Sequence, residues 1–452
     1  MTTESAAAPI ASTSRSYRYY VLGLLTFVYM LNFIDRQILA ILMPVIKVEL
    51  QLTDTQLGFL SGLAFAVFYS MLGIPIARLA DRRDRRMIVA VSIALWSVMT
   101  AACGLAGSFA ALVTARVFVA IGEAGGTPPS HSILSDYFPL SERATAMAIY
   151  ATGVSLGVVF GLAFGGWLGQ TYGWRYAFII LGLPGLLVAA VVAFSLREPQ
   201  RTFAPAAQAD GFSGFLRHIG RFRSVPHFVA AAALQTLVSY AFTQWSASFL
   251  VRSFGYSLVE AGGALALVIG VGGGIGTVLG GMLVDRAART DQRWYMWMPA
   301  ILALVYAATI IPAYLAGSGA LTVMLLIPPA FFSLAYIGPV QALTQTLAGA
   351  RMRATASASF LLVINLIGLG LGPQIVGILS DALAPAQGVH SLRYALLIVS
   401  VLGATWAAIH YVLAARNIRE DLALSRELEM RSGGDGATAA QGASPKPAGA
   451  GQ

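Results

Sequence analysis

The chain has 452 residues, of which 57% are hydrophobic and only 11% are charged, and its mean hydropathy is +0.73. About a quarter of the residues of an ordinary soluble protein are charged, so this composition excludes that class. The formal net charge is +9, and the positions of the basic residues decide what this excess means.

Apolar runs of about 20 residues recur along the whole chain, and this length crosses a hydrocarbon core of ~30 Å. The expected fold class is therefore an all-α polytopic membrane protein with twelve transmembrane helices. The predicted spans lie near 18–43, 54–77, 87–107, 109–135, 144–170, 174–196, 227–251, 258–283, 294–316, 320–347, 354–380 and 390–415.

The two ends of the chain differ from this apolar pattern. Residues 1–17 are small and polar and predict a cytoplasmic tail, and no short apolar segment with a cleavage site predicts a removable signal peptide. Residues 417–452 predict a cytoplasmic, largely disordered tail, because the end of the chain is rich in Gly, Ala and Ser. Cys103 is the single cysteine of the sequence, so an internal disulfide is excluded.

The basic residues follow the membrane topology. With the N-terminus in the cytoplasm, 23 of the 29 Lys and Arg residues fall in inward-facing segments, five of them between Arg78 and Arg86. This is the positive-inside bias, and it predicts a multi-pass protein of the cell (inner) membrane with both termini cytoplasmic. It accounts for the positive charge without a nucleic-acid partner.

Four short patterns occur twice in the same order. TDTQLG at 53–58 and SLVEAG at 257–262 both have the spacing of a helix capping box. Each precedes an Asp-Arg pair, at 81–82 and 285–286, and RATA at 143–146 and WRYAF at 174–178 return as RATA at 353–356 and LRYAL at 392–396. The sequence therefore predicts two pseudo-symmetric six-helix halves, 18–196 and 227–416, joined by a cytoplasmic linker at 197–226.

Parallel six-span repeats are the ground plan of a large transporter fold. ADRRDRR at 80–86, with a weaker second copy GMLVDR at 281–286, resembles the loop signature of the major facilitator superfamily. Ala77 and Asp84 stand where that family usually has glycine. The resemblance implies gating loops that contain Asp81, Arg82, Arg86, Arg143, Asp285 and Arg286, with Asp81 bracing the inner gate.

Within the superfamily the first half resembles the spinster-like (sphingolipid and lysolipid) transporters. The likeness rests on NFIDR at 32–36, GEA at 122–124, DYF at 136–138 and REP at 197–199. Organic-anion:proton symporters of the same superfamily also carry Asp-Arg in the first span. In spinster-like proteins the residues matching Asp35, Arg116 and Glu123 are thought to couple transport to protons, and the resemblance implies the same role here.

Charged side chains within a span cost about 2.5–3.5 kcal/mol each, so they indicate function. From a rise of 1.5 Å per residue, Asp35 and Arg116 lie about 12 and 11 Å from the outer surface, and Glu123 lies about two turns deeper than Arg116. We therefore expect Asp35 to pair with Arg116 or Arg36, and Glu123 to lie farther from a cation. Alternatively, the ion pair only orients spans 1 and 4. If Arg116 is functional, anion binding is a second role for it.

The second half offers polar but uncharged side chains to a substrate bound between the halves. Together with Arg36, the candidate substrate residues are Asn32, Tyr240, Gln244, Gln341 and Asn365. Charge on one side and hydrogen bonds on the other suit an amphiphile or a small organic anion. The alternative for each of these polar residues is a hydrogen bond to a neighbouring helix.

The rival function classes find little support. The match to the serine-hydrolase pattern, GVSLG at 153–157, belongs to a ladder of glycines in span 5, and metal-ligand clusters and cofactor motifs are not found. The sequence thus predicts a monomeric, non-enzymatic, proton-coupled secondary transporter that moves an amphiphilic lipid or drug-like molecule by alternating access, without cofactor or metal. The alternatives are an organic-anion:proton symporter and, more remotely, a non-transporting receptor or channel.

Overall fold

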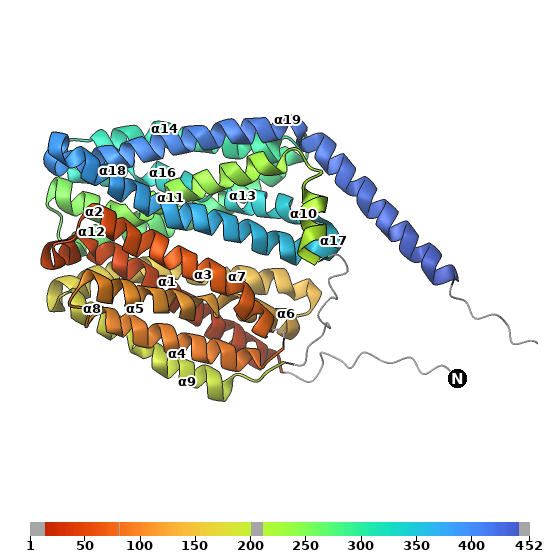
Figure 1. Ribbon diagram of the computed structural model, residues 1–452, viewed down its shortest axis with the longest axis horizontal. Coiled ribbons are helices and arrows are strands. Elements are labelled where there is room, and N and C mark those ends of the chain that lie inside the picture. Colours follow the sequence, from red (N-terminus) through yellow and green to blue (C-terminus); the bar gives the residue numbers. More distant parts are fainter. Residues whose placement is uncertain (1–13, 81, 200–210, 443–452) are drawn as a thin grey trace, which may run out of the picture.

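The structure is a computed structural model, and it describes residues 14–80, 82–199 and 211–442. Every regular element of these residues is a helix, and the helices run along one long axis in two stacked layers (Figure 1). The first half of the chain, red to yellow, forms one layer, and the second half, green to blue, forms the other.

The first layer holds six helical crossings, three of which are interrupted. The elements are α1 (Arg15–Leu50); α2 (Asp54–Gly58), η2 (Phe59–Leu63) and α3 (Ala64–Ala80); α4 (Arg85–Cys103); α5 (Phe109–Ala124) and α6 (Thr127–Tyr137); α7 (Leu140–Tyr172); α8 (Trp174–Gly182) and α9 (Pro184–Ser195). A short helix, α10 (Gly211–Ile219), lies in the linker between the halves.

The second layer repeats this arrangement. Its elements are α11 (Val225–Phe254); α12 (Leu258–Leu265), η3 (Ala266–Gly272) and α13 (Gly273–Ala288); α14 (Trp294–Leu315); α15 (Gly319–Leu325), α16 (Ile327–Ser333) and α17 (Ile337–Ile364); η4 (Asn365–Leu371), α18 (Gly372–Gln387) and η5 (Gly388–His390); α19 (Ser391–Gly442). Gly349, at φ 69°, breaks α17 into the end of the tenth crossing and the start of the eleventh.

The predicted fold class is confirmed. Eleven helical segments of the described chain are long and apolar enough to cross a membrane, and the last, Thr355–Met430, has 76 residues and contains two predicted spans. The predicted capping boxes are also confirmed, at Thr53 before α2 and at Ser257 before α12. The two halves therefore start their second crossings with the same local chemistry.

The last helix continues beyond the predicted span. α19 passes residue 417, where the sequence predicts the start of a disordered tail, because Ile418 and Leu422 extend its buried apolar stripe. Asp421 accepts hydrogen bonds from the backbone N–H groups of Arg223 (3.2 Å) and Ser224 (2.7 Å). This part of α19 thus covers the end of the second layer that lies next to the linker.

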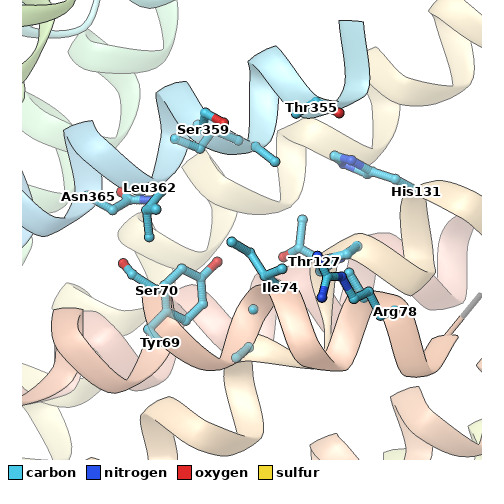
Figure 2. A pocket seen from close by; sticks show the side chains of 16 residues that line it. Tyr69, Ser70, Ile74, Arg78, Thr127, His131, Thr355, Ser359, Leu362 and Asn365 are labelled. Carbon is cyan, nitrogen blue, oxygen red and sulfur yellow. The ribbon is translucent and has the colours of Figure 1, made fainter. Parts of the chain in front are cut away.

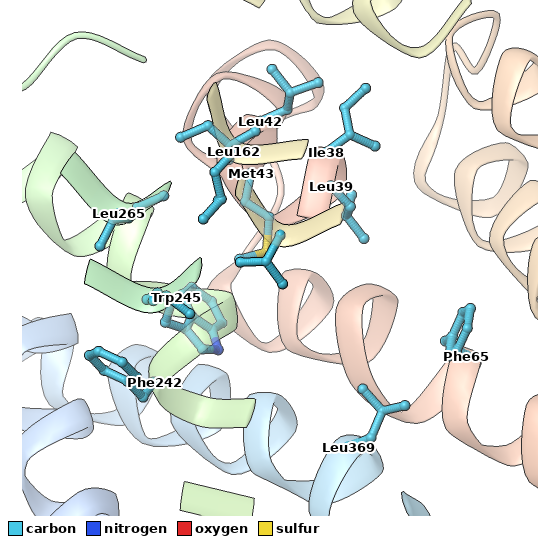
Figure 3. Packing of buried hydrophobic residues seen from close by; sticks show 14 of the residues in the cluster. Ile38, Leu39, Leu42, Met43, Phe65, Leu162, Phe242, Trp245, Leu265 and Leu369 are labelled. Atoms are coloured by element: carbon cyan, nitrogen blue, oxygen red, sulfur yellow. The ribbon is translucent and has the colours of Figure 1, made fainter. Parts of the chain in front are cut away.

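One apolar cluster joins the two layers near the end of the bundle where α2 begins (Figure 3). Its residues come from both halves, and they include Ile38, Leu39, Leu42, Met43, Phe65, Leu162, Phe242, Trp245, Leu265 and Leu369. The halves therefore contact each other closely at this end, while the opposite end carries the linker and both described termini.

Glycines allow helices to approach one another closely. In α13, a Cβ added to Gly276 would overlap the backbone carbonyl of Phe331 in α16, whereas a Cβ added to Gly281 would meet nothing within 4 Å. We expect Gly276→Ala to destabilise the protein by about 1–3 kcal/mol, because the backbones must separate.

The matched control for this prediction is Gly281→Ala on the same helix. Alanine has the higher helix propensity, by roughly 1 kcal/mol, so this variant should be neutral or slightly more stable. Thermal unfolding in detergent measures both variants. Equal melting temperatures would show that the α13–α16 contact does not depend on Gly276.

Candidate functional site

The candidate proton-coupling residues Asp35, Arg116 and Glu123 lie together with Arg36 in the first layer, and all four are buried. Asp35 and Arg36 belong to α1, and Arg116 and Glu123 belong to α5. Glu123 is 0% exposed and Arg116 is 1% exposed. The structure therefore brings the four charged side chains of spans 1 and 4 into one buried cluster.

The pairing within the cluster differs from the expectation. The salt bridge joins Arg36 Nε to Glu123 Oε2 at 2.7 Å, so Glu123 is the acid with a cation beside it. Arg116 Nη1 donates to the backbone carbonyl of Asp35 at 3.4 Å rather than to its carboxylate. An arginine side chain reaches across about one helical turn, so two residues can pair although their backbones lie at different depths.

Aromatic rings surround the Arg36 guanidinium. It lies 5.1 Å from the ring centroid of Phe33, 4.9 Å from that of Phe65 and 4.7 Å from that of Tyr69. Arg116 shares one of these rings, at 5.2 Å from Phe65. Such cation–π contacts stabilise a desolvated guanidinium, so the rings partly offset the cost of burying both cations.

Several polar atoms of the cluster are buried without a hydrogen-bond partner in the protein. These atoms are Asn32 Oδ1, Gln37 Oε1, Arg116 Nε and Glu123 Oε1. A void of about 10 Å³ lies beside them, lined by Phe33, Arg36, Gln37, Ser61, Phe65, Arg116, Tyr240, Gln244 and Leu369. This volume is close to the minimum that holds one water molecule.

A much larger cavity, of about 770 Å³, lies between the two layers (Figure 2). α3, α5 and α6 form one wall, and α17 with the first residue of η4 forms the other. The lining residues are mostly apolar or small: Tyr69, Ser70, Gly73, Ile74, Ala77, Arg78, Ala124, Thr127, Pro128, His131, Thr355, Ala358, Ser359, Leu361, Leu362 and Asn365. The cavity therefore reaches from Asn365 in the middle of the bundle to Arg78 near the end of α3.

The opposite end of the interface between the halves is held by a charged network. Asp54, at the start of α2, accepts hydrogen bonds from Lys47 Nζ (2.5 Å), Arg252 Nη1 (2.8 Å) and Ser380 Oγ (2.7 Å). Asp381 in turn accepts from the backbone N–H groups of Asp54 (3.0 Å) and Thr55 (2.7 Å). These bonds tie α2 of the first half to α11 and α18 of the second.

The predicted substrate residues are only partly brought together. Asn365 lines the large cavity, and Tyr240 and Gln244 line the small void. Asn32 lies close enough to Glu123 for their side chains to interact. Gln341 lies half-buried on α17, and it lines neither cavity.

The predicted gating residues have varied environments. Asp81 lies outside the described residues, and Arg82, Asp285 and Arg286 are exposed at helix ends. The Arg86 guanidinium donates to Asp84 at 2.9 Å, and Arg143 donates to the carbonyl of Ser135 at 2.6 Å at the end of α6. Although burial acts in the opposite direction, the backbone N–H of Met87 and the Arg86 guanidinium lower the pKa of Asp84.

Arg85 is a central residue of this loop that the sequence analysis missed. Its buried side chain donates to Asp136 (2.5 Å) and Glu198 (2.6 Å), so it ties α4 to α6 and to the residues after α9. The signal that could have identified Arg85 is the pair of acids at 136 and 198. Both lie at the same predicted membrane face as the arginines at 82–86.

Metal binding has no support in the described part of the chain. No group of three or more His, Cys, Asp or Glu side chains there is arranged to hold a metal ion. The chemistry that the cluster can perform is the transfer of protons and the rearrangement of ion pairs.

Comparison with known proteins agrees with this architecture. The family model described as Major Facilitator Superfamily matches residues 25–373. An MFS-type efflux pump of Mycolicibacterium smegmatis is 35% identical over 400 residues, which cover 88% of this chain and 93% of that protein. A probable galactarate/D-glucarate transporter of Bacillus subtilis is 27% identical over a region that covers 63% of this chain and 68% of that protein.

Solved structures of a bacterial homologue of the human lysosomal transporter Spinster are also similar. The inward-facing, unoccupied form superimposes with a TM-score of 0.81 at 32% sequence identity, covering 90% of this chain and 99% of that one. The inward-facing, occupied form gives the same values.

Proposed function

Since this chain belongs to the Major Facilitator Superfamily of membrane transporters, we propose that it is a proton-coupled secondary transporter working by alternating access. Its substrate in this proposal is an amphiphilic lipid or drug-like molecule. The observation that carries the proposal is the buried cluster of Asp35, Arg36, Arg116 and Glu123 beside a large cavity between the halves.

The cluster suits proton coupling because its two acids have different partners. Glu123 is paired with Arg36, whereas Asp35 forms no salt bridge with any described residue. A carboxylate in a low-dielectric environment stays ionised beside a cation and takes up a proton without one. A rearrangement that moves Arg36 from one acid to the other would therefore exchange protons, which is what a proton-driven carrier needs.

The cavity favours an amphiphile as substrate. Its volume of about 770 Å³ lies within the range of drug-sized binding sites. Apolar side chains such as Ile74 and Leu362 alternate with polar groups such as Tyr69, Thr127 and Asn365. The similarity to an efflux pump, which covers 93% of that protein, supports the same class of substrate.

An organic-anion symporter is the second candidate, and Arg78 supports it. This side chain lines the cavity and forms no salt bridge with any described residue, so it could meet a carboxylate. The relatives named as sugar-acid transporters point in this direction at lower identity. If the native protein moved sugar acids but not drugs or lipids, and Arg78→Gln abolished the sugar-acid uptake, the second candidate would replace the first.

The orientation in this proposal follows from the distribution of basic residues. The protein lies in the inner membrane, with both termini and the linker on the cytoplasmic side. The large cavity therefore faces the cytoplasm, and the Asp54 network closes the outer end. Asp81 and the arginines near it brace the inner gate when it closes. The protein acts as a monomer within the lipid bilayer, with protons and the substrate as its partners.

The direct test measures flux in proteoliposomes with an imposed pH gradient. Uptake and efflux are followed for sphingoid lipids, fluorescent drugs and sugar acids in parallel. Flux that follows the gradient, and that stops when a protonophore removes it, supports the proposal. Substrate movement that ignores the gradient for every compound tested would refute proton coupling.

Asp35→Asn is the simplest variant for this assay. The amide has nearly the same shape but cannot titrate, so the protein should fold normally and lose transport driven by a proton gradient. Gln37→Glu is not a suitable control because it adds a charge. Thr26→Ala on the same helix is suitable, because the Thr26 hydroxyl donates to the Leu22 carbonyl of its own helix. Full gradient-driven flux in Asp35→Asn would remove Asp35 from the mechanism.

A further inference from the structure

Tyr69 of α3 lies between the large cavity and the buried charges. Its side chain lines the cavity, where Figure 2 shows it beside Ser70 and opposite Asn365. The same ring lies 4.7 Å from the Arg36 guanidinium, which is paired with Glu123. One side chain thus contacts both the space that would hold a substrate and the ion pair.

A second ring continues this contact into the cluster. Phe65, one turn earlier on α3, stacks on Tyr69 with ring centroids 5.6 Å apart and planes at 19°. Phe65 in turn lies within 4.9 Å of Arg36 and 5.2 Å of Arg116. A shift of Tyr69 therefore changes the surroundings of both buried cations.

We propose that Tyr69 is the positioning residue through which a molecule in the cavity acts on the Arg36–Glu123 pair. This inference rests on the proposed function and adds the route by which substrate and proton sites communicate. With the ring over the guanidinium, Arg36 is held beside Glu123. A ligand that draws the ring into the cavity loosens Arg36, and Glu123 then takes up a proton.

Tyr69 is an indirect neighbour of Glu123, so the other groups around the acid must be kept constant in any test. The titratable or charged residues that face Glu123 are Asp35 and Arg36 from α1, Arg116 from α5 and Tyr240 from α11. On the α4 side, the close contacts of neighbouring Gly122 are with uncharged Trp96 and Ser92.

The test measures the protonation of Glu123 directly. Dicyclohexylcarbodiimide modifies protonated carboxyl groups in membrane proteins, and mass spectrometry separates the Glu123 peptide from the Asp35 peptide. In Tyr69→Leu, which removes the ring, the pH midpoint of Glu123 modification should rise by about one unit, a tenfold change that matches a desolvated cation–π contact. Tyr69→Phe keeps the ring face and should keep the wild-type midpoint.

Phe68→Leu is the matched control. Phe68 is the preceding aromatic residue of α3, is 40% exposed and does not line the cavity. Its replacement should leave the midpoint unchanged. A role for Tyr69 in folding alone would lower the stability of Tyr69→Leu without moving the midpoint, and that result would overturn the proposal.

A second experiment places an occupant in the cavity without knowledge of the substrate. Ser359 lines the cavity wall opposite α3, and the single native cysteine, Cys103, is buried. N-phenylmaleimide attached to Ser359→Cys should raise the midpoint of Glu123 modification when Tyr69 is present, and should have at least threefold less effect in the Tyr69→Leu background. Equal effects in both backgrounds would refute the route through Tyr69.

These outcomes are separable from those of the proposed function. Midpoint shifts that depend on Tyr69, in a protein whose flux ignores a pH gradient, would support the route and refute proton-coupled transport. Gradient-driven flux without any Tyr69-dependent shift of the midpoint would support proton-coupled transport and refute the route through Tyr69.

Discussion

Arg36→Met should abolish transport driven by a pH gradient, with a loss of at least about 100-fold. Methionine fills similar space but leaves Glu123, which is 0% exposed, without its cation. Removing one partner of a buried pair costs about 3–5 kcal/mol, because the remaining charge is uncompensated. Glu123 avoids this cost by keeping a proton, and it can then no longer exchange one during the cycle.

The double variant Arg36→Met/Glu123→Gln separates stability from coupling. It removes both charges, so thermal stability should recover toward that of the native protein, while gradient-driven flux stays absent. An exposed pair serves as control: Arg419→Ala breaks the bond to Asp291 and should change stability by less than about 1 kcal/mol. Native flux in Arg36→Met would show that the pair only orients α1 and α5.

Asp54→Asn should open the end of the bundle that the structure shows closed. The Asp54 carboxylate is almost fully buried and is the shared acceptor of Lys47, Arg252 and Ser380. Hydrogen bonds to a charged group contribute about 1.5–3 kcal/mol each, so losing the charge weakens the bonds that Arg252 and Ser380 of the second half donate to Asp54. The two cations then repel each other across the interface.

The measurement is labelling of a single cysteine at Ser61→Cys in a Cys103→Ala background. Ser61 is 1% exposed and lies one to two turns inside the closed end. A membrane-impermeant maleimide should react at least about tenfold faster in the Asp54→Asn variant, because 1.4 kcal/mol corresponds to a factor of ten. Unchanged labelling would show that the charge of Asp54 is not needed to hold this end closed.

Glu49→Gln is the matched control for this experiment. Glu49 lies five residues before Asp54 and bonds Arg175 and Trp174 at the same end of the bundle. All three residues belong to the first half, so the variant breaks a charged contact without loosening the interface between the halves. It should leave the labelling rate at position 61 at the native value.

The sequence by itself determined the architecture. Hydropathy is a local property of about 20 residues, so the spans could be located without knowledge of their neighbours. The capping boxes at Thr53 and Ser257 are equally local, since each involves one turn of helix, and both are present in the structure. The repeat of these signals revealed the two halves, because the same helix starts recur in the same order.

The sequence also identified the buried charges but not their partners. Asp35, Arg116 and Glu123 stand out because a charge within an apolar span is costly wherever the helix goes. Their pairing depends on how α1 crosses α5 and on how far the Arg36 side chain reaches. These are tertiary properties, and the structure accordingly pairs Arg36 with Glu123 rather than with Asp35.

Contacts between distant segments were decided by the tertiary structure alone. Asp54 meets Arg252 and Asp381 across 198 and 327 residues, and Arg85 meets Glu198 across 113. In the sequence, Tyr69 is one of many aromatic residues in apolar spans. Only the fold shows that its ring lies between Arg36 and the cavity. Local patterns state which side chains a membrane helix must bury, whereas the packing of helices against one another selects the groups that each side chain meets.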